Sequence, residues 1–573
     1  MGWQDTLETW EWRLKNWFGS CETIIGPNEP LPGTDINAGN IRDYSGTAKL
    51  NEITKRLSGC NFWRSIRILK NKDSRSTGLR PTINLGKFIN ISQGKVHPRQ
   101  NIWLSEKSLY KNVAIIGPPG SGKTEGFIIP GIKTAIDAGL SNIVIDVKGG
   151  ELINKLGYYA EQKGMRVIYW SALPQEVSRS HSINLLDNIN SLQEAKILAK
   201  SLYGNIDDLG ENRRFASREI TWIAQWIMLV KQVYGYAATL KDIYKIAESP
   251  VEQLEELVER CRDPELKAQI DSQLKLMEDD NSGIGFSWGI QDAISFLNWP
   301  NFVEVTGHSD ILLRDIQSSP TLLVIGAELV GRDVSKKISS ALIDVLMTIF
   351  YERWTSNNRG PGIVFWIDEF PRIQKQIDIE EFSSVSRSGR GSIVIAAQSL
   401  EQIDRNYREP VMENFNTVVL CRGASQGASE WLARRLGFRY KNERSRKHRK
   451  TNLSKRPFGW QFEDERYTSR RTQAPVLDTK EIISPLGGQY VAVVHARSAC
   501  SKPFLVDYNK RFLERSIPWQ PTRSKKLIWR EGEQNQIQGH YRPRVAQNLV
   551  FRESNLGEQT EERSNPRRVI WPD

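Results

Sequence analysis

Short apolar runs, bounded by glycine or charged residues, recur along the middle of the chain. Runs of this length that are rich in Val and Ile predict buried strands. We place such strands at 142–147, 166–170, 321–325 and 392–397, with another that ends at Gly117. Strands that are apolar on both faces are typical of parallel sheets covered by helices. The pattern therefore predicts an α/β fold.

Between residues 192 and 296 the apolar positions follow the period of a helix instead. Ile220, Ile223, Ala224, Ile227 and Val230 fall on one helical face, and the charged stretch 251–277 is also amphipathic. We interpret this region as an all-helical domain inserted into the α/β core.

The N-terminus has a helical stripe of its own. Trp3, Trp10 and Trp17 are seven residues apart, with Leu7 and Leu14 between them. Such a helix can pack on its own domain, or it can dock on a partner or a membrane surface, because tryptophan suits an apolar–polar boundary. The sequence leaves these alternatives open.

Composition limits the class of protein. The 573 residues are 39% hydrophobic, which excludes a wholly disordered chain, and 79 basic against 67 acidic residues give a net charge of +12. This excess favours polyanions as partners. The five cysteines are scattered, as expected in a reducing compartment, and no transmembrane helix or signal peptide is predicted, so we expect a cytoplasmic protein.

The strongest motif follows the first predicted strand and reads GPPGSGKT. Its glycines let backbone N–H groups curl around a phosphate, the lysine reaches the β- and γ-phosphates, and the threonine hydroxyl holds Mg²⁺. A helix that is kinked or broken near Pro130 should follow. ATP and Mg²⁺ are thus the expected cofactors, and the nucleotide-binding residues are Gly117, Pro118, Pro119, Gly120, Ser121, Gly122, Lys123 and Thr124.

A second motif, GPGIVFWIDEFP, runs from residue 360 to 371. Here a strand runs directly into Asp368 and Glu369. In an ATPase with this loop, the first acid orients Mg²⁺ and the second polarises the attacking water. Together with the phosphate loop, the acidic pair predicts a hydrolytic site, with Thr124 and Asp368 on the metal and Glu369 as general base.

Three further candidates flank the strand predicted at 392–397. Gln398, at its end, can contact the γ-phosphate or its water, and the strand's position suggests a RecA-like arrangement. Arg387 and Arg390 precede the strand and can stabilise transition-state charge in a neighbouring subunit. Alternatively, both arginines are solvated surface residues.

Together these segments resemble the type IV secretion coupling proteins of the TraG/TraD kind, which are related more distantly to the FtsK/HerA translocases. The resemblance spans about residues 85–508 and includes IVFWIDEFPRI, RSGRGSIVIAAQSLEQI, DVKGGEL at 146–152, SEWLARRLG and APVLDTKEI. Two features depart from the family: the usual N-terminal transmembrane helices are not found, and DVKGGEL has one extra glycine.

The resemblance implies a DNA-pumping ATPase that works as a homo-oligomeric ring, expected to be a hexamer, on single- or double-stranded DNA and on relaxase or effector substrates. It further implies a secretion-channel or membrane partner, Arg387 as the residue acting across the subunit boundary, and a RecA-like P-loop domain with a large inserted all-α domain. The expected organisation is an N-terminal region at 1–84, the nucleotide-binding domain at 85–186 and 306–508, the inserted domain at 187–305, and a largely disordered basic tail at 509–573.

DNA contact is expected in a basic run from residue 434 to 456, which holds eleven Lys or Arg against Glu443 alone. Such a run can neutralise several phosphates. Its scarcity of apolar residues predicts a mobile loop, with Arg446, Lys447, Arg449 and Lys450 as the candidate contacts. The alternative is a solvated linker.

Two other functions remain open at this stage. One is a soluble HerA/FtsK-like translocase in DNA processing or defence. The other is a non-hydrolysing DNA-binding scaffold or adaptor, which the complete set Lys123, Thr124, Asp368 and Glu369 argues against.

Overall fold

The structure is a computed structural model, and it divides into two compact units. The first comprises Met1–Ala138, Asp368–Pro371 and Ser392–Leu513, and the second comprises Gly139–Ile367, Arg372–Gly391 and Glu514–Asp573. The residues described are 23–25, 81–90, 95–204, 213–278, 283–326, 333–355, 360–374, 379–450, 463–497, 502–508 and 517–521.

The sheet of the first unit is mixed. Its described strands follow the order β1-β3-β2-β14-β13-β10-β4-β9. β4 lies between β10 and β9 and is parallel to both, whereas β13, β14 and β2 join by antiparallel pairing. The strands are β1 (Thr23–Ile25), β2 (Pro81–Asn90), β3 (Lys95–Ser105), β4 (Val113–Ile116), β9 (Gly391–Ala397), β10 (Thr417–Cys421), β13 (Val491–Ala496) and β14 (Phe504–Asp507).

The sheet of the second unit is parallel, in the order β8-β5-β7-β6. Every residue of β5, β7 and β8 is buried. This explains why these strands read as continuous apolar runs rather than alternating ones. The strands are β5 (Ser141–Asp146), β6 (Arg166–Trp170), β7 (Thr321–Gly326) and β8 (Ile363–Ile367), so the α/β prediction and the predicted strands are confirmed.

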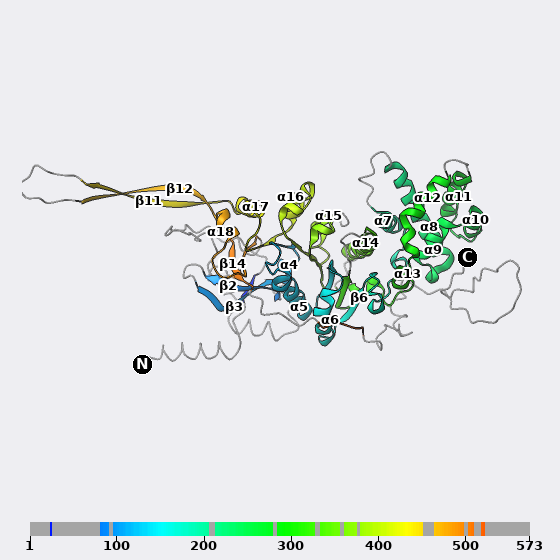
Figure 1. Cartoon of the computed structure of the whole chain (residues 1–573), viewed down its shortest axis with the longest axis horizontal. Coiled ribbons are helices and arrows are strands. Elements are labelled where there is room, and N and C mark those ends of the chain that lie inside the picture. Colours follow the sequence, from blue (N-terminus) through cyan, green and yellow to red (C-terminus); the bar gives the residue numbers. More distant parts are fainter. Residues whose placement is uncertain are drawn as a thin grey trace, which may run out of the picture. The chain divides into compact units, whose positions relative to one another are not determined.

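Helices fill the region between β6 and β7. The predicted apolar face of α8 is buried, with Ile223 and Ile227 both fully inaccessible, and α9 begins at a capping box of Thr239 and Asp242. The elements are α7 (Leu192–Tyr203), α8 (Arg213–Tyr234), α9 (Leu240–Glu248), α10 (Val251–Glu259), α11 (Pro264–Glu278), α12 (Gly283–Ile294) and α13 (Pro300–Thr306) (Figure 1). The exact limits of the inserted domain, 187–305, stay a prediction.

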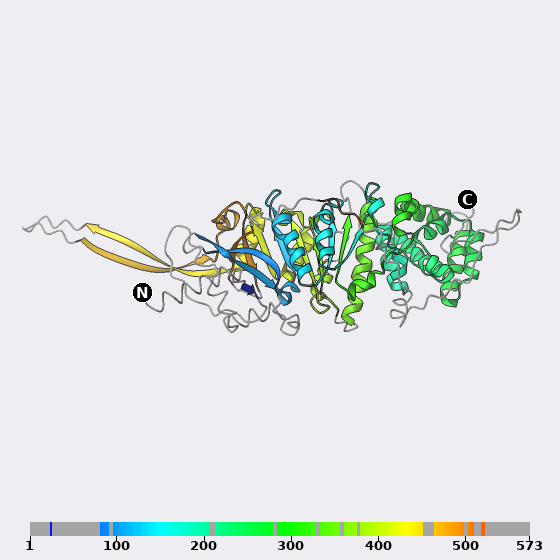
Figure 2. The same ribbon diagram turned by 90° about the horizontal axis from the view of Figure 1, so that it is seen from below.

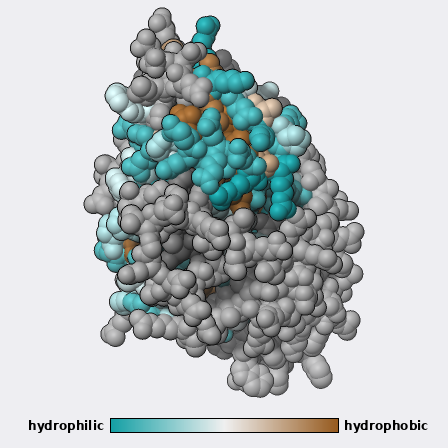
Figure 3. Space-filling view, turned by 90° about the vertical axis from the view of Figure 1, so that its right-hand side faces the viewer, coloured by the Kyte–Doolittle hydropathy of each residue, from teal (hydrophilic) through white to brown (hydrophobic). Residues whose placement is uncertain are grey.

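Figure 2 shows the same ribbon from below. The other described α-helices lie outside the region between β6 and β7. They are α4 (Glu106–Leu109), α5 (Ile129–Asp137), α6 (Glu151–Gln162), α14 (Asp333–Thr355), α15 (Ile379–Val385), α16 (Arg405–Asn414), α17 (Gln426–Leu436) and α18 (Thr479–Ile483). Figure 3 faces α8–α12, where the described surface is mostly hydrophilic with a few hydrophobic spots. Within the described residues, no helix is both long and apolar enough to span a bilayer.

Most of the basic run predicted to be a mobile loop is a strand instead. Arg434 and Arg435 belong to α17, residues 438–450 form β11, and residues 451–456 lie outside the described residues. β11 (Phe438–Lys450) pairs antiparallel with β12 (Glu463–Pro475) over their full lengths, and Figure 1 shows them as a long two-stranded ribbon. The register offers a physical reason, because three basic positions oppose three acidic ones: His448 with Glu465, Arg449 with Asp464, and Lys450 with Glu463. The prediction considered the basic run alone and therefore missed its partner.

Two other predictions concern the ends of the chain. The tryptophan-striped helix lies outside the described residues. Most of the predicted tail does too, but residues 517–521 are described, and Trp519 among them is only 1% exposed. The sequence analysis did not anticipate this packed segment.

Candidate nucleotide-binding site

The phosphate loop connects β4 to a helix through a tight turn. Gly120 and Gly122 have φ values of 75° and 85°, in the left-handed region that favours glycine. The chain then enters a π-helix at Thr124–Ile128, followed by α5, which has Pro130 in its first turn. The backbone stays helical through this point, since Ile128 and Ile129 both have helical angles, so no break occurs at Pro130. The irregularity is the π-helical turn that directly precedes the proline.

Lys123 is buried, with 8% of its surface exposed. Its Nζ donates to the carbonyl oxygen of Gly117 at 2.5 Å and to that of Pro118 at 3.1 Å. The ammonium is therefore held by the backbone of the loop itself. Phosphate oxygens can replace these acceptors, since they offer the same hydrogen bonds together with a full negative charge.

Thr124 and Asp368 form the centre of the site. Thr124 Oγ1 donates to Asp368 Oδ2 at 2.9 Å, and Asp368, directly after β8, is only 4% exposed. One hydroxyl and one carboxylate are the oxygen ligands that Mg²⁺ takes when phosphates and water complete its shell. No cluster of three or more His, Cys, Asp or Glu suited to a metal occurs in the described part of the chain.

Glu369 adopts a left-handed backbone conformation, with φ of 63°. This region is costly for a residue with a side chain, and such strain concentrates at functional sites. The carboxylate is partly exposed, whereas Asp368 beside it is buried. The two acids therefore differ in environment, as separate roles in metal binding and proton transfer require.

Gln398 lies beside the loop, as the sequence predicted. Ile116 pairs with Ala397 in the parallel β4–β9 register, and the Gly117 N–H donates to the Ala397 carbonyl at 3.1 Å. Gln398 therefore leaves β9 next to the point where the phosphate loop leaves β4. The carboxyl ends of adjacent parallel strands are the usual place for ligand contacts.

Tyr508 and Cys421, which the sequence analysis did not select, contact the phosphate loop and support its conformation. Tyr508 Oη donates to the Ser121 carbonyl at 2.7 Å, and its ring lies 4.5 Å from that of Phe127, measured between centroids. Cys421 packs against Gly117, where an added Cβ would lie 2.5 Å from the cysteine Cβ. Burial raises the pKa of the Cys421 thiol to about 11, so it stays protonated. Neither residue has a motif of its own.

Arg387 and Arg390 belong to the second unit and differ in their use. Arg390 Nη1 donates to the Gly360 carbonyl at 3.0 Å, and its backbone φ is 56°. Arg387 is exposed. Arg390 therefore stabilises the local turn through its hydrogen bond to Gly360. Arg387 remains the better candidate to reach another subunit.

Comparison with known proteins decides the family. Residues 70–457, more than half of the chain, match the model of the family described as type IV secretory system conjugative DNA transfer. The chain belongs to this conjugative DNA-transfer family. The resemblance expected from the motifs is thereby confirmed. Lys123, Asp368 and Glu369 lie within the matched residues.

Solved structures with a similar fold agree with this family. The unbound bacterial conjugative coupling protein TrwBdeltaN70 is 15% identical, with a TM-score of 0.50, over 76% of this chain and 92% of that one. The plasmid coupling protein TrwB in complex with ADP and Mg²⁺ is also 15% identical, with a TM-score of 0.50, over 72% and 88%. No curated protein matches the sequence. At these identities the structures show a shared fold, which confirms the RecA-like P-loop class.

The four predicted DNA contacts lie on β11 of the ribbon. In the register Arg446 is opposite Tyr467, Lys447 opposite Arg466, and Lys450 opposite Glu463. Arg449 lies between them, opposite Asp464. This conjugative DNA-transfer protein thus carries the predicted basic residues on a paired strand in the first unit, the unit that also holds the phosphate loop.

Proposed function

We propose that this chain is an ATP-hydrolysing coupling protein that recruits and pumps DNA or nucleoprotein in conjugation and type IV secretion. The observation that carries the proposal is the hydrogen bond from Thr124 to Asp368, which joins the phosphate loop to the acid after β8. Two motifs far apart in the sequence thereby form one oxygen-rich site. The family match and the fold support the same function.

Each residue of the site has a distinct task. ATP with Mg²⁺ supplies the cleavable phosphoanhydride when bound. Lys123 and the loop N–H groups would hold the phosphates, and Thr124 and Asp368 would hold the metal. Glu369 would accept the proton of the attacking water, which Gln398 would help to orient.

Arg387 would complete the site of a neighbouring subunit, so the proposal includes a homo-oligomeric ring, with a hexamer as the proposed form. Its exposure and the local bond of Arg390 support this choice. The ribbon residues Arg446, Lys447, Arg449 and Lys450 would contact DNA phosphates. Relaxase-bound DNA or effectors are the proposed cargo, and a channel or membrane protein is a further proposed partner at the inner membrane.

Steady-state ATP hydrolysis by the full chain tests the proposal, with and without single- and double-stranded DNA across a salt series. We expect turnover that DNA stimulates and that salt weakens. Lys123→Ala should abolish it, because the loop loses its only charge directed at the phosphates. Unchanged turnover in this variant would overturn the hydrolytic mechanism, and no hydrolysis by the wild type under any condition would favour a scaffold.

A further inference from the structure

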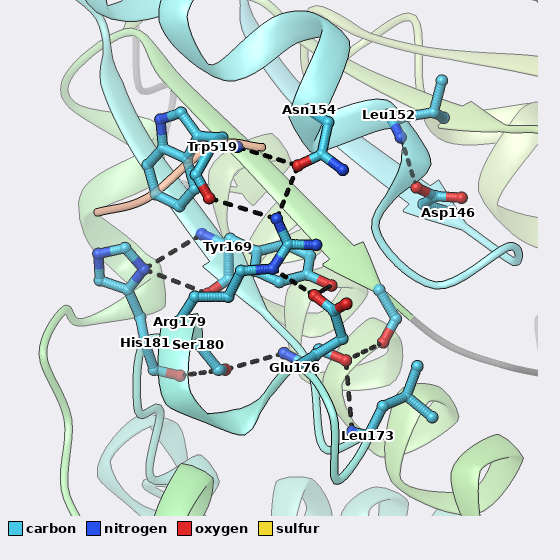
Figure 4. Close-up of polar contacts among 12 residues, drawn as sticks. Asp146, Leu152, Asn154, Tyr169, Leu173, Glu176, Arg179, Ser180, His181 and Trp519 are labelled. Carbon is cyan, nitrogen blue, oxygen red and sulfur yellow. Dashed lines mark hydrogen bonds and ion pairs between the residues drawn. The ribbon is translucent and has the colours of Figure 1, made fainter. Parts of the chain in front are cut away.

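A five-residue segment near the C-terminus packs against the second unit through one buried side chain. Residues 517–521 read IPWQP, and they run beside α6 and the loop that carries Arg179 (Figure 4). Trp519 is 1% exposed, whereas Ile517 is 55% exposed and Gln520 is exposed. Trp519 is therefore buried, whereas Ile517 and Gln520 on either side of it are exposed to solvent.

The floor of the groove is a glycine in the middle of α6. A Cβ added at Gly157 would lie 2.3 Å from Trp519 Cδ1 and 2.6 Å from Cγ, which no real contact allows. Glycine is among the poorest residues for a helix interior. Its place in α6 is explained by the close approach of the indole ring.

The backbone of the segment is bound as well as its side chain. Asn154 Oδ1 accepts from the Trp519 N–H at 3.0 Å, the Asn154 carbonyl accepts from the Ile517 N–H at 3.3 Å, and Arg179 Nη1 donates to the Trp519 carbonyl at 3.2 Å. The indole Nε1 donates to Glu161 Oε1 at 3.3 Å. Every polar group that Trp519 offers in the groove has a partner, as a recognition site requires.

The receiving side chains are held in place by one another. Arg179 Nη1 also donates to Asn154 Oδ1 at 2.6 Å, and Arg179 forms an ion pair with Glu176. Glu176 in turn accepts from the Tyr169 hydroxyl at 2.9 Å, and the guanidinium lies 5.0 Å from the centre of the Tyr169 ring. Such second contacts fix rotamers before a ligand arrives and lower the entropy lost on binding.

We propose that this groove is a docking site for a linear peptide motif centred on tryptophan, and that its occupant is the chain's own segment 517–521. Two prolines favour the extended backbone that the groove receives. Docking attaches the residues that follow, 522–573, to the second unit beside α6. The proposal is independent of ATP hydrolysis, because none of these residues belongs to the nucleotide site.

The segment belongs to the same chain as the groove, so its docking is intramolecular. An intramolecular ligand competes as if it were present at a concentration on the order of 1 mM. A free peptide at micromolar concentration should therefore be excluded from the wild-type chain and admitted once the indole is removed.

A fluorescent peptide of residues 514–522 (ERSIPWQPT) tests this by anisotropy on the full-length protein. We expect Trp519→Ala protein to bind the peptide at least tenfold more tightly than wild type, and Gln520→Ala, the matched control, to exclude it as wild type does. Gly157→Leu, added to Trp519→Ala, should abolish binding, and so should replacing tryptophan by alanine in the peptide.

An unchanged circular dichroism spectrum and a cooperative thermal unfolding transition serve as the check that each variant is folded. A folded Trp519→Ala protein that does not bind the peptide would overturn the docking site, and so would equal binding by wild type. Exclusion by wild type that fades on dilution of the protein would overturn the assignment to the chain's own segment and give the groove to another copy.

Discussion

Thr124 Oγ1 and Asp368 Oδ2 lie 2.9 Å apart, although 244 residues separate them in the sequence. The hydroxyl sits at the first turn after the phosphate loop, and the carboxylate follows β8. A hydrogen bond between them holds the two oxygens next to each other. The pair is thus pre-organised to receive Mg²⁺ with little rearrangement.

The first prediction concerns that pair. Thr124→Val, which keeps the shape and removes the hydroxyl, should lower kcat/KM for ATP by about tenfold or more, or ~1.4 kcal/mol of transition-state stabilisation. Thr124→Ser should retain most of the activity, because it keeps the ligand oxygen. A Mg²⁺ titration of hydrolysis measures both variants. If valine behaved like serine, the hydroxyl would not be a metal ligand.

Glu369 has a proposed role as general base and also a strained backbone conformation. Two variants distinguish the effect of the side chain on activity from the effect of the backbone on stability. Glu369→Gln should lower kcat by about 10²–10⁴-fold while ATP still binds, because the general base is lost. Glu369→Asn should lose the same activity but fold at least as well, since asparagine tolerates a positive φ. Single-turnover phosphate release and the midpoint of thermal unfolding distinguish these effects. Rapid release by the glutamine variant would exclude Glu369 as the base.

The neighbouring arginines should divide their roles. Arg387→Ala should lower turnover by about 10³-fold without changing nucleotide affinity, as expected for a residue acting across a subunit boundary. Arg390→Ala should mainly lower thermal stability, because the Gly360 carbonyl loses its donor. Mixing Arg387→Ala protein with Lys123→Ala protein provides the control, since sites formed between the two variants should recover part of the activity. Equal loss of affinity and turnover in Arg387→Ala would make that residue structural.

The ribbon should contribute to DNA binding mainly through charge. Replacing Arg446, Lys447, Arg449 and Lys450 by glutamine removes up to four phosphate contacts. The slope of log K against log salt for duplex DNA should then fall by about 3.6, at roughly 0.9 for each contact. ATP affinity should not change. An unchanged slope would place the DNA contacts elsewhere in the chain.

The protein should become less stable in mild acid because of the buried His181. Burial lowers the pKa of His181, against smaller opposing effects from the Tyr169 backbone and the Asp310 carboxylate, and its ring stacks 6.2 Å from that of Trp519. The folded protein therefore prefers the neutral ring, while the unfolded chain binds more protons below its ordinary pKa of about 6.5. Stability should be complete above that pH and fall as the pH decreases. Thermal midpoints between pH 5.5 and 7.5 should show the loss, and His181→Gln should flatten it.

The parts of the fold that the sequence predicted correctly are those where nearby residues alone indicate burial or backbone conformation. The apolar run at 321–325 is a strand because it is buried on both faces, and Gly120 and Gly122 are required by backbone angles that other residues avoid. These signals lie within a few residues of the feature. Gln398 was found because it follows directly from such a strand.

The missed features depend on a partner that is remote in the sequence. β11 carries poor strand formers, and its acidic complement in β12 begins only at Glu463. Trp519 lies in a polar tail, and the glycine that admits it is Gly157. Tyr508 reaches the Ser121 carbonyl over 387 positions. In each case the residue is ordinary by itself, and its role exists only once the two segments meet.

The ribbon of β11 and β12 has a consequence for solubility. Within the described residues it is a sheet of two strands, so each strand keeps one edge where another chain could add by backbone hydrogen bonding. Charged residues are a common protection of such edges. The same arginines and lysines that suit a polyanion would then also keep ribbons of separate molecules apart, and neutralising them by mutation or by high salt removes that protection. The surface proposed to bind DNA would in this way also protect the protein against edge-to-edge aggregation.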